Sequence, residues 1–253
     1  MMKKLKVATY NICHGVDYLH AENRDGATAV NLDLCAEVIR EIGADVIGMN
    51  EVYSVGEEDM TEQTEKLAAR ASYPYCRFAR GFFFPWQMDI GNAVMSRYPI
   101  LSLETVPVPA PVGDERRPDE NEWYEDRVIL CVKLDVEGTP VRFISTHFGL
   151  NLQEKERMMA RLLPLLDREK MPTVLLGDFN AQPDDAVLAP LFDRLKSAAA
   201  VRGNTECTFS AWDPYLRIDY IFVSDEFDVT DYRVIHQIAS DHMPICADLL
   251  LHE

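Results

Sequence analysis

The chain has 253 residues, of which 47% are hydrophobic and 26% are charged, and its formal net charge at pH 7 is −17. A chain of this length can bury a sizeable core. No linker, repeat or low-complexity tract divides it, so we expect one catalytic domain over residues 1–253. The acidic balance argues against a nucleic-acid-binding surface, because such surfaces usually carry basic patches that neutralise phosphates.

Targeting and redox signals are weak. We find no run of about 18 or more apolar residues, so we expect no transmembrane segment and a soluble, cytoplasmic protein. The six cysteines are far apart and form no CxxC motif. This favours reduced core cysteines over a disulfide framework or a zinc site. Two acidic stretches, residues 57–65 and 114–126, are expected to be solvated loops.

The first quarter of the chain alternates between strand and helix patterns. The expected strands are residues 4–12 and 45–51, and the expected helices are residues 31–42 and 61–71. Residues 31–42 place their apolar side chains on one helical face, and Gly43 follows as a stop signal. The two strands end at Asn11 and Glu51, which are both polar.

Further strands dominate the rest of the chain. The expected strands are residues 92–96, 127–134, 141–146, 173–176, 218–223 and 245–250, and the expected helices are residues 151–166 and 184–195. Asn151 and Glu154 have the spacing of a capping box at a helix start. The aromatic stretch from Phe82 to Trp86 is expected to pack in the core or anchor a loop, with a pocket wall as the alternative.

Polar or acidic residues recur where short apolar strands end. Asn11, Glu51, His147 and Asp178 all hold this position. Rigid strand ends can present catalytic groups without leaving buried charges unpaired. We therefore expect these four side chains to contribute to one site.

The residue types available suit the hydrolysis of a phosphate ester. This reaction needs a hard cation, a base that activates water, and donors that stabilise developing charge. Oxygen ligands suit Mg²⁺ or Mn²⁺, whereas the His and Cys clusters typical of zinc are absent. The oxygen ligands are Glu51, Asp178 and Asp241 with the amides of Asn11 and Asn180, and the donors are His147 and His242.

An ordered set of motifs strengthens this interpretation. The segments are Thr9-Tyr10-Asn11-Ile12, Asn50-Glu51-Val52, Gly91 to Arg97, Ser145-Thr146-His147, Gly177-Asp178-Phe179-Asn180, Arg217 to Phe222 and Ser240-Asp241-His242. Together they resemble the endonuclease/exonuclease/phosphatase superfamily, which includes pancreatic deoxyribonuclease, abasic-site endonucleases, sphingomyelinases and inositol-polyphosphate phosphatases. The resemblance implies an α+β fold, a four-layer α/β/β/α sandwich of two packed mixed sheets with flanking helices.

The resemblance also implies roles at the metal and at the attacking water. Glu51 would be the principal metal-binding carboxylate, with Asn11 as a ligand of metal or phosphate and Asp241 facing the metal. Asp178 would orient or deprotonate the water, and Asn180 would hold that water or a phosphate oxygen. Whether one or two metal ions act stays open.

The implied phosphate donors are two histidines. His242, positioned by Asp219, would contact the scissile phosphate, and His147 would donate to the phosphate or the leaving oxygen. Because a carboxylate beside an imidazole raises its pKa, we expect both histidines to be cationic.

Three further residues have supporting roles in the resemblance. Asp126 and Arg127 are similar to an acidic–Arg pair of the nuclease branch, in which the acid partners the first histidine. Asn92 lies in a matched segment.

Three functions remain open. The first is a metal-dependent phosphoesterase acting on a small or lipid-derived phosphoester, which the acidic charge favours. The second is a Mg²⁺-dependent nuclease on DNA or RNA, which the charge disfavours without excluding it. The third is a non-catalytic binding module, which would be marked by the loss of a catalytic residue, and none is lost. The oligomeric state is also open.

Overall fold

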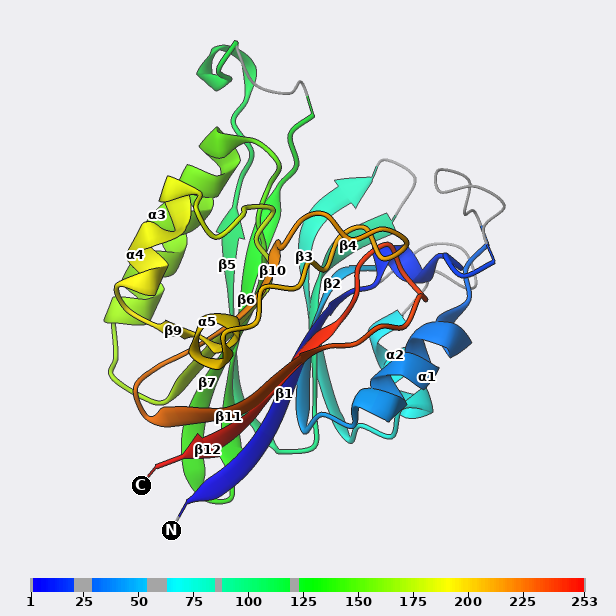
Figure 1. The fold of residues 1–253 in the computed structure, drawn as a ribbon. Helices are drawn as coiled ribbons and strands as arrows, with labels where there is room; N and C mark the ends of the chain where they lie inside the picture. The colour runs from blue at the N-terminus through cyan, green and yellow to red at the C-terminus, as the bar shows by residue number, and fades with distance from the viewer. Residues whose placement is uncertain (1, 21–28, 54–62, 85–87, 119–122, 253) are drawn as a thin grey trace.

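The computed structural model describes residues 2–20, 29–53, 63–84, 88–118 and 123–252. Two six-stranded sheets pack face to face, and helices lie on their outer sides (Figure 1). Each sheet combines antiparallel pairs with one parallel pair. The predicted α+β sandwich of two mixed sheets with flanking helices is therefore confirmed.

The first sheet has the strand order β11-β12-β1-β2-β4-β3. Its strands are β1 (Lys3–Asn11), β2 (Val46–Tyr53), β3 (Tyr75–Phe84), β4 (Met88–Ser96), β11 (Phe227–Val234) and β12 (Ile245–Leu251). Strands β1 and β12 are antiparallel neighbours with Lys3 opposite Leu251. The two ends of the chain therefore lie side by side at one end of the sandwich (Figure 1).

The second sheet has the order β5-β6-β7-β8-β10-β9. Its strands are β5 (Ile100–Val108), β6 (Arg127–Val136), β7 (Thr139–His147), β8 (Thr173–Asp178), β9 (Lys196–Ser197) and β10 (Asp219–Val223). The eight strands expected from the sequence are all present. The strands that were not expected, β3, β5, β9 and β11, are the four sheet edges.

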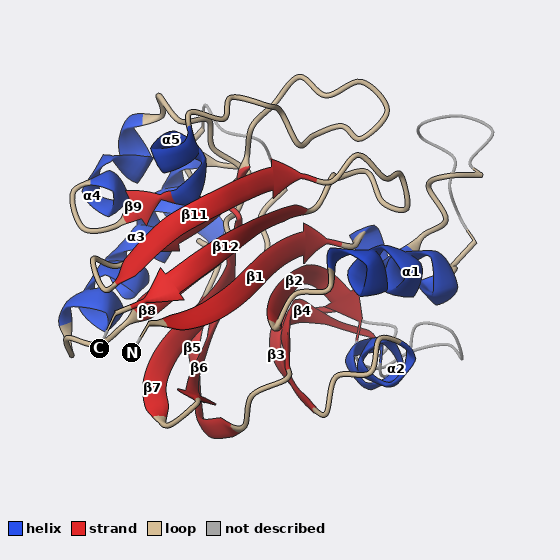
Figure 2. Cartoon of the chain, turned by 60° about the horizontal axis from the view of Figure 1, so that its bottom comes forward, coloured by secondary structure: helices blue, strands red, loops and turns tan. Residues whose placement is uncertain are grey.

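Helices lie on opposite sides of the two sheets (Figure 2). They are α1 (Leu32–Ile42), α2 (Gln63–Arg70), α3 (Leu152–Asp167), α4 (Ala189–Phe192) and α5 (Ala198–Arg202), with single 3₁₀ turns at η1 (Cys13–Gly15), η2 (Gly113–Glu115) and η3 (Ala186–Leu188). The helix expected over residues 184–195 is shorter and begins as η3, since Pro190 cannot donate a helical hydrogen bond. No helix in the described part of the chain is both long and apolar enough to cross a membrane.

The helix boundaries follow local chemistry. Asn31 caps α1 by accepting a hydrogen bond from the Leu34 amide at 3.4 Å, and Gly43 ends it in a left-handed conformation. The predicted capping box is present at α3, where the Asn151 amide donates to Glu154 at 3.2 Å.

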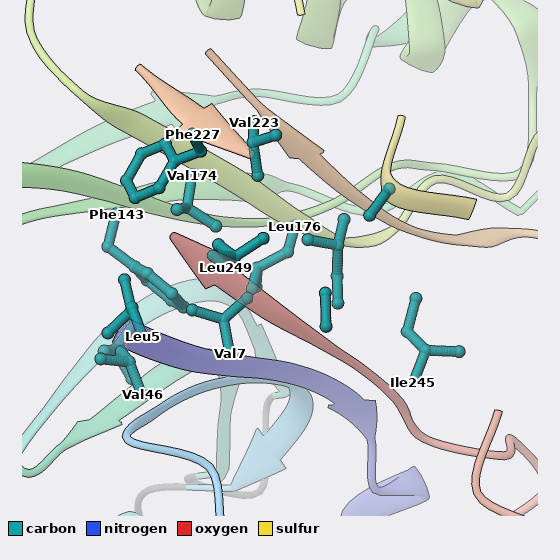
Figure 3. Packing of buried hydrophobic residues seen from close by; sticks show 14 of the residues in the cluster. Leu5, Val7, Val46, Phe143, Val174, Leu176, Val223, Phe227, Ile245 and Leu249 are labelled. Atoms are coloured by element: carbon teal, nitrogen blue, oxygen red, sulfur yellow. The ribbon is translucent and has the colours of Figure 1, made fainter. Parts of the chain in front are cut away.

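The largest apolar cluster fills the space between the sheets (Figure 3). Leu5 and Val7 of β1 point into it toward Phe143 and Val174 of the second sheet. Alternate residues of β1 pack instead against α1, so this strand is buried on both faces. A third cluster joins the second sheet to α3. Burial on both faces fixes the register of the central strands, and therefore the positions of the residues at their ends.

The expectations for the two acidic stretches and for the aromatic stretch from Phe82 to Trp86 fall partly outside the described residues. Positions 57–62 of the first acidic stretch, positions 119–122 of the second, and Trp86 lie outside them. Within the described part, Asp126 is exposed in a loop, as expected, and Asp114 is exposed in the η2 turn. Glu65 is exposed but belongs to α2, and Glu125 is half-buried against Arg127, so the expectation of solvated loops holds only in part. All six cysteines are free thiols, as expected, but only Cys35, Cys131 and Cys246 are buried in the core.

Candidate active site

Parallel strand pairs bring the polar strand ends together at the end of the sandwich away from the chain termini (Figure 1). Strands β1 and β2 are parallel and place Asn11 beside Asn50, one residue before Glu51. Strands β7 and β8 are parallel and place His147 beside Asp178. The side-chain nitrogen Nδ2 of Asn11 donates to Oδ2 of Asp178 at 3.1 Å, and this hydrogen bond links the two sheets. The four strand-end side chains expected to share a site therefore lie together.

Glu51 lies at a bulge of β2 against β4, where the register shifts between Met49 and Val52. Its φ of 53° is unusual for a residue with a side chain and re-aims the carboxylate. Oε1 accepts from Nδ2 of Asn11 at 3.0 Å, and Oε2 lies 3.3 Å from Nε2 of His14. Burial opposes the charge, but His14, His147 and Asn11 lower the pKa of Glu51 to about 2. The carboxylate is therefore ionised at neutral pH.

Asp178 lies between the two buried imidazoles. Its Oδ2 is 3.5 Å from Nε2 of His147 and 3.6 Å from Nε2 of His242. Its Oδ1 accepts from the backbone amide of Asn180 at 2.8 Å. Burial and the neighbouring Asp219 raise the pKa of Asp178 to about 7, against the opposing effect of His242. A carboxylate with this pKa can accept a proton near neutral pH.

The second ring nitrogen of His242, Nδ1, is held by the carboxylate of Asp219. Nδ1 lies 2.9 Å from Oδ2 of Asp219, which also accepts from the Thr208 hydroxyl at 2.5 Å. Burial disfavours the imidazolium, but Asp219 and Asp178 raise the pKa of His242 well above its usual value. His242 is therefore cationic, as expected, with Nε2–H directed toward Asp178.

Asp241 and Asn180 are two further residues that were expected at the active site. The Ser240 hydroxyl donates to Asp241 at 3.0 Å, and burial with the nearby Glu51 charge raises the pKa of Asp241. Asn180 has a φ of 45°, and its side-chain amide donates to the Phe148 carbonyl at 3.0 Å. That same amide nitrogen lies 3.3 Å from Nε2 of His147.

His147 differs from the expectation that it is cationic. Nη1 of Arg127 lies 3.0 Å from its Nδ1, and a guanidinium can only donate. Nδ1 therefore accepts, and the proton of the neutral ring lies on Nε2. Burial and the Arg127 charge lower the pKa of His147 well below its usual value. The two histidines thus present the same N–H group to the site, one from a neutral ring and one from a cation.

The acid of the Asp126–Arg127 pair lies elsewhere than expected. Asp126 accepts from the Ala110 backbone amide at 2.8 Å and is exposed, whereas Arg127 contacts His147. Glu125 balances the Arg127 charge at 2.7 Å. Adjacent residues of an extended chain point in opposite directions, so only one of Asp126 and Arg127 reaches the histidine.

A family model described as the Endonuclease/Exonuclease/phosphatase family matches residues 8–242. The chain belongs to this family. It is similar to the uncharacterised protein YbhP of Escherichia coli K12, with 26% identity over 97% of this chain and 96% of that protein.

Solved structures of the endonuclease/exonuclease/phosphatase family share the fold. A family member from Beutenbergia cavernae is 27% identical with a TM-score of 0.77, over 99% of this chain and 72% of that one. ANGEL2, described as a 2′,3′-cyclic phosphatase, is 16% identical with a TM-score of 0.74, over 100% of this chain and 97% of that one. Phosphatases and nucleases of this family are hydrolases, and the family generally uses a divalent metal.

The residues present fit a divalent cation beside Glu51. In the described ranges, no Lys or Arg lies within 4.0 Å of its ionised carboxylate, so a half-buried negative charge lacks a fixed cationic partner. Asn11 adds an amide next to it. A second group, Asp178, Asp219 and His242, also has ligand atoms within 4.8 Å of one another. There, Nδ1 of His242 and Oδ2 of Asp219 already bind each other, so the Glu51 side fits a cation better.

Several residues that contribute to the site were not identified from the sequence. Asn50 donates to Asn92 at 2.8 Å and to the Thr146 carbonyl at 2.9 Å, and it accepts from the Asp178 amide at 2.9 Å. Asn92 in turn donates to the Val128 carbonyl at 2.8 Å, so its supporting position joins the sheets behind the site. The signal for Asn50 was its place next to Glu51.

His14 and Thr208 are the other two residues of the site that were not identified from the sequence. His14 contacts Glu51, and Thr208 contacts Asp219. His14 follows the first matched motif by two residues. Thr208 carries no comparable signal in the sequence, because the loop that returns it to the site is irregular.

Proposed function

We propose that the chain is a divalent-metal-dependent phosphoesterase, with one catalytic domain over residues 1–253. It hydrolyses a phosphodiester or phosphomonoester of a small or lipid-derived compound by means of an activated water. The observation that carries this proposal is the arrangement around Asp178. A carboxylate with a pKa of about 7 lies within 3.6 Å of two imidazole Nε2 atoms and is bridged by Asn11 to the ionised Glu51.

Glu51, Asn11 and Asp241 would hold Mg²⁺ or Mn²⁺. These residues offer carboxylate and amide oxygens, which suit both ions. When bound, the cation would neutralise charge on the phosphoryl oxygens. It would also compensate the ionised Glu51 and favour the ionised form of Asp241, whose pKa burial and Glu51 raise.

Asp178 takes the proton of the attacking water in this proposal, as its pKa near neutrality allows. Asn180, held in a left-handed conformation beside it, orients that water or a phosphate oxygen. The water oxygen forms a bond to phosphorus as the ester P–O bond breaks. The leaving oxygen then needs a proton donor on the opposite side.

His242 and His147 supply the donors to the phosphate. His242, with Nδ1 committed to Asp219, donates from Nε2 as a cation and stabilises the developing negative charge. His147 donates from Nε2 of a neutral ring, oriented by Arg127 through Nδ1. A neutral imidazole does not give up this proton, so the Nε2–H group hydrogen-bonds a phosphoryl oxygen or the leaving oxygen, and solvent water supplies the proton that the leaving oxygen takes.

Two features support a small substrate over a nucleic acid. The net charge of −17 repels a polyanion, and the Arg127 charge at the site is balanced by Glu125. The Phe209 ring lies 4.9 Å from the His242 ring, and the 63%-exposed Tyr215 packs on Phe209 at 5.8 Å. This aromatic surface suits an apolar or ring-bearing group of the substrate.

The test is hydrolysis of bis-p-nitrophenyl phosphate, p-nitrophenyl phosphate and plasmid DNA by chelator-stripped protein, each with and without Mg²⁺ or Mn²⁺. Glu51→Gln is the matched control, because it keeps the size of the side chain and removes the charge. We expect metal-restored cleavage of a small ester, a loss of roughly 10²-fold or more in Glu51→Gln, and intact plasmid.

The remaining outcomes distinguish the alternatives. Plasmid nicking at comparable protein concentration would replace the small-substrate proposal with a nuclease. If none of the three substrates is hydrolysed with either metal, the chain is a binding module. Equal activity of the wild type and Glu51→Gln would contradict the proposed metal site.

A further inference from the structure

His14 lies in an unusual turn directly after β1. Cys13, His14 and Gly15 have φ angles of 42°, 59° and 74°, so three consecutive residues are left-handed. The Cys13 amide donates to the Asn11 side chain at 3.1 Å, and the Gly15 amide donates to the Ile12 carbonyl at 2.8 Å. Left-handed residues with side chains are strained and persist when the surroundings hold them in place. The turn returns His14 toward Glu51.

A buried amide fixes this turn to β2. Gln63 of α2 is 0% exposed, and its Nε2 donates to the His14 carbonyl at 2.5 Å. Its Oε1 accepts from the Tyr53 backbone amide at 3.0 Å. One side chain therefore holds the backbone of His14 and the backbone of Tyr53, two residues after Glu51, at a fixed separation.

The side chains of His14 and Tyr53 are stacked. Their ring centroids are 4.2 Å apart and their planes differ by 13°. This contact fixes the plane of the imidazole, and Nε2 then lies 3.3 Å from Oε2 of Glu51. The ring is thus restrained through its backbone and through its face.

The other ring nitrogen decides which tautomer fits. Nδ1 of His14 is buried and has no hydrogen-bond partner among the described residues. A metal-binding histidine usually donates its second N–H to an acceptor, which Nδ1 lacks here. A proton on Nε2 avoids an unpaired buried N–H and gives Glu51 a hydrogen bond instead.

We propose that His14 is a positioning residue for Glu51, donating from Nε2 to Oε2 so that the carboxylate is held ready for the divalent cation. Asn11 donates to the other oxygen at 3.0 Å, so each oxygen has one protein donor and keeps lone pairs for the cation. The inference rests on the metal site of the proposed function. In this role, His14 keeps the bulged, left-handed Glu51 in one orientation.

The test compares His14→Asn with His14→Gln. Both replacements carry an amide, but Asn reaches only the position of Nδ1, whereas Gln reaches that of Nε2 and can donate to Glu51. Asn also tolerates the left-handed backbone, so its variant separates loss of the donor from loss of the turn. The measurements are the dissociation constants for Mg²⁺ and Mn²⁺ alone, by titration calorimetry of chelator-stripped protein, and the melting temperature of each variant in chelator.

We expect His14→Asn to weaken both metals by about 10- to 100-fold, as when an outer partner of a metal ligand is removed. His14→Gln should stay within about threefold of the wild type, and the metal-free melting temperatures should be similar. Unchanged metal affinity in His14→Asn would overturn the inference. A loss confined to Mn²⁺ that His14→Gln fails to restore would also overturn it, in favour of direct ligation by the imidazole. A wild type that binds neither metal would instead refute the proposed metal site.

Discussion

The carboxylate of Asp219 lies 2.9 Å from Nδ1 of His242 and fixes which nitrogen of that ring faces the site. Because Nδ1–H donates to Asp219, Nε2 is directed toward Asp178. The Thr208 hydroxyl binds the same oxygen of Asp219 and holds the pair in place. The pair therefore sets the orientation and the charge of the imidazole.

Asp219→Asn should lower kcat by roughly 10²- to 10⁴-fold. The amide keeps the size of the carboxylate but removes the charge that raises the His242 pKa, and its NH₂ group would favour the wrong tautomer. Steady-state kinetics on the best small ester measure the loss. Thr208→Val, which removes one hydrogen bond to Asp219 and keeps its charge, should cost much less. A Thr208→Val loss as large as that of Asp219→Asn would contradict this account.

Arg127 should keep His147 neutral. Arg127→Met removes the guanidinium next to Nδ1, so the pKa of His147 should rise toward its usual value while remaining limited by burial. The check is the pH titration of the His147 ring signals by NMR in metal-stripped protein, assigned with His147→Asn.

The control is the His242 ring, whose charge depends mainly on Asp219 and Asp178. Its titration should change little in Arg127→Met. An unchanged His147 pKa would show that burial alone keeps that ring neutral.

The sequence predicts the interior of the fold better than its edges. All eight strands that were expected lie inside a sheet, whereas β3, β5, β9 and β11 lie at the edges. Edge strands have less buried surface, and β5 exposes Leu101 and Leu103, so its apolar residues do not mark one buried face. Pattern reasoning therefore works where burial on both faces leaves a nearly continuous apolar run.

The sequence likewise predicts some residues of the site and misses others. Residues at the ends of central strands, such as Glu51 and Asp178, are predictable because strand register fixes them. Contacts that depend on turn geometry are not: His14 reaches Glu51 through three left-handed residues, and no spacing rule foretells that. Sequence reasoning also expected Asp126 at His147, whereas Arg127 makes this contact. A shift of one residue along an extended chain reverses the direction of the side chain.

Asn50 should be a major stabilising residue of the sandwich. It is fully buried and makes three hydrogen bonds, two of them to the second sheet. Asn50→Leu keeps the branched shape of the side chain but leaves the Thr146 carbonyl and the Asp178 amide without this partner. We expect the free energy of unfolding in urea to fall by about 3 kcal/mol or more.

The comparison for Asn50 is Asn31→Ala, which removes the N-terminal cap of α1 and the hydrogen bond from Nδ2 of Asn31 to Asp17. That change should cost about 1 kcal/mol. If Asn50→Leu costs no more than Asn31→Ala, the two sheets do not depend on this network.

Asp178 should make the metal-free protein less stable as the pH rises. Its pKa is about 7 in the folded chain and lower when unfolded, so between about pH 4 and 7 the folded state binds more protons. Stability therefore falls with rising pH over this window. Asp178→Asn cannot ionise, so its melting temperature should gain on the wild type from pH 5 to pH 8.

Glu51→Gln is the matched control for this pH dependence. Because the pKa of Glu51 is lowered to about 2, its contribution is complete above its ordinary value of 4.5 and is lost only as the pH falls toward 2. The melting-temperature difference between Glu51→Gln and the wild type should therefore be flat from pH 5 to pH 8. Parallel curves for the wild type and Asp178→Asn over this range would show that Asp178 is already ionised in the metal-free protein. It would then lack the affinity for a proton that the proposed base requires.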